Sequence, residues 1–115
     1  MSGMARVLVL EPDAEIRRLF CQMLTRLGHE PRVLAGAANG AEDCDAVLLE
    51  PAWRAGVERA RRLAAGPGAR PIVAASIHSA GTAAAGLPVV RHLVKPFTLV
   101  QLADAIAEAL AAGRR

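Results

Sequence analysis

Four apolar runs in this sequence each end on a side chain that can do chemistry. Glu11, Glu50, Ser76 and Lys95 stand at those ends, and Asp13 lies two residues beyond the first of them. An apolar run without alternation is typical of a strand covered on both faces, as in parallel sheets flanked by helices. Open α/β sheets place their ligands at the carboxyl ends of the strands. We therefore expect three acids, a hydroxyl and an ammonium to meet on one edge of a sheet.

The first strand and helix follow from local signals. Residues 6–10 are predicted to form a buried strand with an apolar run at 7–10, which Pro12 ends. Asp13 is placed to cap a helix because its carboxylate can accept unpaired amides of the first turn. That helix has an apolar stripe at helical spacing and ends at Gly28. The stripe consists of Ile16, Leu19, Phe20, Met23, Leu24 and Leu27.

The rest of the chain continues the alternation of strands and helices. We expect strands at 30–34, 45–50, 71–77 and 87–94, with Pro31 moving the first of these to a sheet edge. Helices are predicted at 54–65 and from the cap Thr98 to Gly113, with short helical turns at 41–43 and 79–86. This order predicts one α/β domain, 1–115, with a doubly wound five-stranded parallel sheet and short second and fourth helices.

Composition limits the class of protein. The 115 residues are 53% hydrophobic and 22% charged, which is typical of a globular domain and not of a disordered chain. No apolar stretch reaches the roughly 18 residues of a membrane span, and no secretion signal precedes the first strand, so we expect a cytoplasmic protein that makes no membrane contact. Cys21 and Cys44 have no metal-ligand spacing and are expected to be reduced thiols.

Charge patterning gives one further feature. The net charge is +3, and four arginines gather on the helix predicted at 54–65, while aromatic residues are only 3% of the chain. The pattern favours a solvated helix face over a phosphate-binding stripe. The four residues are Arg54, Arg59, Arg61 and Arg62.

Four segments carry a resemblance to a known family: Val7–Asp13, Asp45–Glu50, Pro71–Ser76 and Val94–Phe97. Over essentially its whole length the sequence resembles the receiver domain of bacterial two-component response regulators, which has a flavodoxin-like fold. In that family a pair of acids binds magnesium, and an aspartate at the tip of the third strand accepts a phosphoryl group from a histidine kinase. A Ser or Thr hydroxyl and a lysine then contact this group, and the resemblance assigns these roles to Ser76 and Lys95. It also implies a cis Lys95–Pro96 bond.

The departures from that pattern concern the acids. Glu50 stands in place of the phosphoacceptor aspartate, and Glu11 is followed by Pro12 where the family has two adjacent acids. Magnesium is therefore expected to bind weakly or not at all, through Glu11, Asp13 and the carbonyl of Pro51. His92 stands where the family has an aromatic residue that moves on activation.

The longer acid changes the expected chemistry. Glutamate reaches about 1.5 Å further than aspartate, and an error near 1 Å in a reacting group can cost on the order of 10²-fold in rate. We therefore expect Glu50 not to be phosphorylated efficiently. Its carboxylate can instead reach Lys95 directly, with Ser76 donating to its other oxygen, and so imitate the modified state.

Structural explanations of the same residues remain open. The acid and lysine can be a buried pair without a signalling role, and this is as well supported as a locked state. Asp13 is more typical of a helix cap than of a metal ligand, and His92 of a half-exposed strand residue than of a switch. Trp53 either covers the site or packs on the helix that follows it, and packing is favoured.

Three function classes follow. The first is a phosphorylation-independent interaction module that binds a protein partner or a second copy through the last strand and its flanking helices. The second is a magnesium-dependent phosphoacceptor controlled by a histidine kinase. The third, an enzyme on a flavodoxin-like scaffold, is disfavoured because residues 66–68 precede a strand and no nucleophile–base pair is evident. Nucleic acid binding is expected only through an output domain outside this sequence.

Overall fold

The computed structural model describes residues 4–33, 43–65, 68–77 and 86–113. Within them, five parallel strands form one sheet in the order β2–β1–β3–β4–β5. The strands are β1 (Arg6–Leu10), β2 (Glu30–Val33), β3 (Ala46–Leu49), β4 (Ile72–Ser76) and β5 (Val89–Val94). The order 2-1-3-4-5 is the flavodoxin-like arrangement of a doubly wound sheet.

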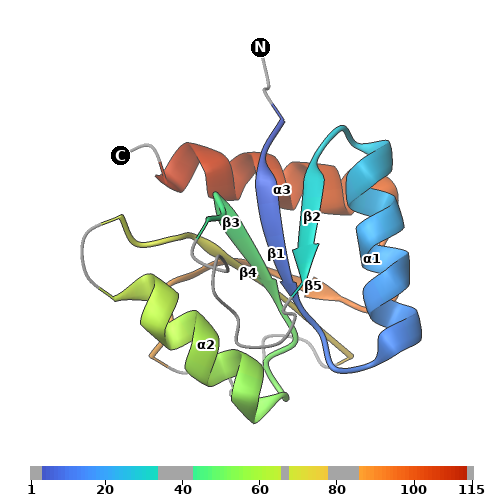
Figure 1. Ribbon diagram of the computed structural model, residues 1–115. Helices are drawn as coiled ribbons and strands as arrows, with labels where there is room; N and C mark the ends of the chain where they lie inside the picture. Colours follow the sequence, from blue (N-terminus) through green and yellow to red (C-terminus); the bar gives the residue numbers. More distant parts are fainter. Residues whose placement is uncertain (1–3, 34–42, 66–67, 78–85, 114–115) are drawn as a thin grey trace.

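Helices cover both faces of this sheet (Figure 1). On one face α1 (Ala14–Arg26) and α3 (Leu99–Gly113) pack on the side chains of Val7 and Val9. On the other face α2 (Arg54–Ala64) packs on Leu8 and Leu10. Successive residues of a strand point to opposite faces, so β1 supplies alternate side chains to two apolar cores. The predicted doubly wound α/β fold is confirmed.

The element boundaries differ little from those predicted. β1 spans the predicted residues, and β2 is an edge strand, as its proline indicated. β5 begins at Val89, two residues later than predicted, after a turn in which Gly86 adopts φ +87°. The last helix includes Gly113 and does not stop before it. A side chain there would approach Pro71 to 3.2 Å, so glycine allows α3 to lie close to the start of β4.

The two short helices predicted from the sequence cannot be compared in the same way. Apart from Asp43 and Gly86, which belong to no helix, residues 41–43 and 79–86 lie outside the described residues. Within the described part of the chain, no helix has the length and apolar character needed to span a membrane.

Trp53 packs on the first turn of α2 and belongs to the apolar core under that helix. A Cβ atom added at Gly56 would lie 2.6 Å from Trp53 Cε3, closer than carbon atoms approach, and 3.2 Å from Leu49 Cδ1, a tight contact. The packing that the sequence favoured for Trp53 is therefore present, and glycine at 56 is what permits it.

We expect Gly56→Ala to shift the fluorescence emission of Trp53 and to destabilise the protein by up to about 2 kcal/mol. Helix propensity alone would stabilise the variant by about 1 kcal/mol, but overpacking costs about 1–3 kcal/mol. Urea unfolding and emission spectra measure both effects. Ala55→Gly, on the exposed side of the same turn, should weaken the helix and leave the emission unchanged. An unshifted spectrum in Gly56→Ala would contradict the packing argument.

Candidate functional site

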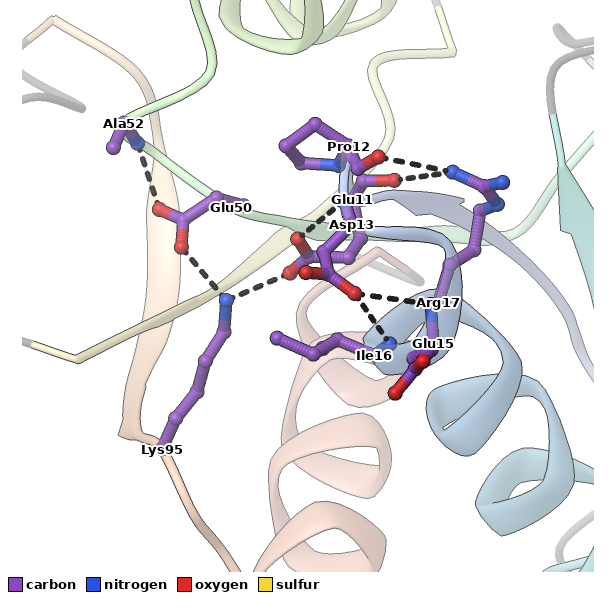
Figure 2. A network of polar contacts seen from close by, with 9 residues as sticks. All are labelled: Glu11, Pro12, Asp13, Glu15, Ile16, Arg17, Glu50, Ala52 and Lys95. Carbon is purple, nitrogen blue, oxygen red and sulfur yellow. Dashed lines mark hydrogen bonds and ion pairs between the residues drawn. The ribbon is translucent and has the colours of Figure 1, made fainter.

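Lys95 joins two acids at the carboxyl edge of the sheet (Figure 2). Its Nζ donates to Glu11 Oε1 and to Glu50 Oε1, each at 2.7 Å. Glu11 follows β1, Glu50 follows β3 and Lys95 follows β5, so the three groups come from three strands. The sequence predicted the contact between Lys95 and Glu50; that Lys95 also binds Glu11 was not foreseen.

The remaining carboxylate oxygens are bound by backbone amides. Glu11 Oε2 accepts from the Asp13 amide at 3.1 Å, and Glu50 Oε2 accepts from the Ala52 amide at 2.8 Å. The side chains of Glu11, Glu50 and Lys95 are 3%, 11% and 11% exposed. Charge-assisted hydrogen bonds of this length are among the stronger ones in proteins. All four oxygens of the two acids are thus satisfied by the chain itself.

The two acids also act on the protonation of Lys95. Burial alone would lower the pKa of its ammonium, but the hydrogen bonds to Glu11 and Glu50, with their charges, raise that pKa above its usual 10.5. The ammonium therefore stays charged at neutral pH. Two carboxylates and one ammonium leave the cluster with a net charge of −1.

The backbone of Lys95 is held by its neighbours in the sheet. Its amide donates to the carbonyl of Ser76 at 2.8 Å, which fixes the end of β5 against the end of β4. The Lys95–Pro96 bond is cis, as the resemblance implied. Nζ lies 5.8 Å from the ring centroid of Phe20, which packs on Phe97 with centroids 5.1 Å apart. Phe20 was expected only as a core residue; it also lies beneath the ammonium.

Asp13 lies at the start of α1 and caps it. Its Oδ1 accepts from the amides of Glu15 at 3.0 Å and Ile16 at 3.1 Å. This is the helix cap that the sequence favoured. Next to it, Arg17 Nη1 donates to the carbonyls of Glu11 at 2.9 Å and Pro12 at 3.5 Å, which holds the turn after β1. No sequence signal singled out Arg17, because its partners are backbone atoms.

Removing the cap has a predictable cost. We expect Asp13→Ala to destabilise the protein by about 0.5–2 kcal/mol, because two amides of the first turn of α1 lose their acceptor. Thermal and urea unfolding measure this loss. Asp13→Asn keeps an oxygen at the same place and should retain most of the stability. An equal loss in both variants would indicate that the charge of Asp13 matters more than the cap.

The other predicted site residues, Ser76, His92 and Pro51, lie on β4, on β5 and in the turn after β3. Ser76 is buried at the end of β4, and the hydrogen bond predicted from its hydroxyl to Glu50 stays a prediction. His92 is exposed on β5, as a strand residue, and its role as a switch stays a prediction. Pro51 is buried in the turn after β3.

The arrangement does not fit a magnesium ion. Lys95 Nζ lies between the carboxylates of Glu11 and Glu50, and Asp13 uses an oxygen to cap α1. Among the described residues, no group of three or more His, Cys, Asp or Glu side chains is placed to hold a metal. Magnesium requires several oxygen ligands in near-octahedral geometry. It would have to displace the ammonium to acquire the acids as ligands.

Comparison with known proteins shows the fold through solved structures. No protein-family model matches the sequence, and neither does any curated protein. The chain is similar to a chemotaxis response regulator of Vibrio cholerae, with 20% identity and a TM-score of 0.75 over 94% of this chain and all of that one. It is similar to the receiver domain of a sensor histidine kinase of Pseudomonas aeruginosa, with 19% identity and a TM-score of 0.74 over 95% of this chain and 99% of that one. That structure has a magnesium ion coordinated in its active site cleft.

Longer proteins contain the same fold. NtrX of Brucella abortus, in complex with ATP, matches with 24% identity and a TM-score of 0.74 over 96% of this chain. The match spans 27% of the NtrX chain. These likenesses establish that the chain has the fold of receiver domains.

Proposed function

We propose that this chain is a receiver domain of a two-component response regulator that acts as a protein-interaction module without phosphorylation at Glu50. The observation that carries the proposal is the position of Lys95 Nζ, 2.7 Å from both Glu11 and Glu50. In the receiver family that lysine contacts the phosphoryl group. Here the carboxylate of Glu50 takes the lysine instead and imitates the modified state.

Electrostatics support the same conclusion. An incoming phosphoryl group is an anion, and it needs cations to neutralise the charge that develops during transfer. Lys95 is already shared by two carboxylates, and the cluster keeps a net charge of −1. Without a metal, a phosphoryl donor would be repelled by the site, so transfer to Glu50 is disfavoured beyond the effect of the longer side chain.

A groove beside the site supports binding of a protein partner. It has a volume of about 280 Å³ and lies between α1 and the turn from β5 to α3. Leu19 and Ile77 on its walls are 52% and 68% exposed, so two large apolar side chains face solvent in the same groove. Lys95 also lines the groove, so a partner there would contact the residue that the acids hold. The groove is lined by Ile16, Leu19, Phe20, Met23, Ile77, Lys95, Pro96 and Phe97.

Titration with magnesium, with and without beryllofluoride, tests the proposal. Trp53 reports on the turn after β3, because its amide donates to the Glu50 carbonyl at 3.1 Å. We expect no saturable change in Trp53 emission or in amide NMR shifts, and no mass gain of a phosphoryl group after incubation with acetyl phosphate. Saturable binding, with shifts spreading from Glu50 to Lys95, would favour the second candidate, a magnesium-dependent phosphoacceptor under a histidine kinase.

The variant Glu50→Gln separates a locked signalling state from a merely structural pair. Glutamine is nearly isosteric but has no charge to hold the ammonium. If the contact locks a conformation, amide shifts should extend from residue 50 through β5 into the first turn of α3. Shifts confined to residues that touch position 50 would leave the pair with a structural role only. Glu108→Gln, in the exposed pair with Arg91, is the matched control.

A further inference from the structure

The outer face of α2 exposes three arginines, Arg54, Arg61 and Arg62, and one acid, Glu58, whereas Arg59 is half-buried. The helix contains four arginines and one glutamate, a net charge of +3. The whole chain has 14 basic and 11 acidic residues, so its other residues have ten of each, and the net charge of +3 resides on α2. Such concentration of one sign on a short helix marks a surface for anions.

Helix geometry places the charged side chains on one stripe. Arg54, Glu58, Arg61 and Arg62 follow one another at i, i+4, i+7 and i+8 and are all exposed, while Val57, Ala60 and Leu63 face the sheet. Glu58 approaches only Arg61, at 3.9 Å. Within the described residues, no acid pairs with Arg54 or Arg62. The guanidinium groups of Arg54 and Arg62 are thus available to bind an anion, and that of Arg61 is held only weakly by Glu58.

A hollow beside this charged stripe of α2 is large enough to hold an anion. It has a volume of about 470 Å³ and lies between α2 and the turn after β3, with Arg54, Arg61 and the acid Glu58 on its walls. No acid lies in the first turn of α2, and no side chain caps it. An anion there would be attracted by two guanidinium groups and the positive end of the helix dipole, against the repulsion of one carboxylate, Glu58.

We propose that this face of α2 binds the phosphate backbone of nucleic acid without sequence preference. The face has no large exposed apolar side chain to anchor a protein interface, and no Asn or Gln to read base edges. It offers dispersed guanidinium groups, the groups that neutralise backbone phosphates and release counterions. An 11-residue helix is about 16 Å long, enough to follow roughly five base-pair steps. This inference is independent of the proposed function of the acid site.

Fluorescence anisotropy with a labelled duplex of mixed sequence, at increasing salt, tests the proposal. Three phosphate contacts predict that log K falls with log salt with a slope of about −3. Arg54→Gln with Arg62→Gln should weaken binding at least tenfold and bring the slope to about −1. Glu58→Gln should act in the opposite direction and tighten binding. A second duplex of unrelated sequence should bind equally well.

The matched control is Arg18→Gln with Arg26→Gln on α1, because both arginines are exposed and the net charge falls by the same amount. It should leave affinity within about twofold. Equal weakening by both pairs of substitutions would overturn the proposal, because binding would then depend on overall charge. Absence of duplex binding at low salt would also overturn it and would mean that the face of α2 is only solvated. If poly-glutamate binds as tightly as the duplex and with the same slope, the face recognises acidic protein and the proposal fails.

Discussion

Replacement of Lys95 by methionine is expected to destabilise the protein by about 3–5 kcal/mol. Methionine keeps the apolar stem and removes the ammonium, which leaves Glu11 and Glu50 without a cation while their side chains are 3% and 11% exposed. Breaking one member of a buried ionic cluster costs more than the cluster contributes, because the remaining charges stay buried. Urea unfolding at neutral pH measures the loss.

Arg91→Met is the control for this prediction. Arg91 Nη1 lies 2.9 Å from Glu108 Oε1, a distance similar to those of Lys95, but the two side chains are 43% and 48% exposed. An exposed pair contributes less than about 1 kcal/mol. Adding Glu50→Gln to Lys95→Met removes one of the two buried carboxylates left without a cation and should restore part of the stability. If Lys95→Met costs no more than Arg91→Met, the cluster is not the buried unit described above.

The same cluster determines how stability responds to alkaline pH. The folded protein holds the Lys95 proton more tightly than the unfolded chain, because its pKa is raised above 10.5. The contribution of Lys95 is therefore complete below about pH 10.5 and is lost as the pH rises through the raised pKa. From neutral pH, the difference in unfolding free energy between wild type and Lys95→Met should stay constant up to about pH 10.5 and shrink above that value.

Replacement of Phe20 by alanine is the second variant with a large expected effect, about 3–5 kcal/mol. Phe20 is 4% exposed, belongs to the core under α1 and α3, and packs on Phe97. Its removal leaves a cavity under Lys95 that the strands of a parallel sheet cannot close. We also expect the amide shifts of Lys95 and Phe97 to change.

Leu19→Ala provides the comparison for Phe20. Leu19 precedes Phe20 on α1 and is 52% exposed, so its truncation removes little buried area and should cost less than about 1 kcal/mol. Unfolding of both variants under the same conditions separates core packing from helix propensity, since alanine favours the helix in each case. A loss below about 2 kcal/mol in Phe20→Ala would contradict the role of its ring as the support of the site.

The sequence by itself determined the layers and the edge at which the site lies. Apolar runs without alternation predicted buried parallel strands, and the helical spacing from Ile16 to Leu27 predicted α1. The acids and the lysine follow those runs, so their meeting at one edge of the sheet was predictable. The cap at Asp13 was predictable for the same reason, because its partners are amides two and three residues away.

Only the tertiary structure decided which groups bind one another at that edge. The sequence pointed to one partner for Lys95, and the structure gives it two, with the Asp13 and Ala52 amides completing the acids. Backbone amides are the same at every residue except proline, so no sequence pattern marks them. The arginines of α2 are a second example. The sequence shows that they share one helix, but whether acids from other elements neutralise them depends on which elements fold against that face.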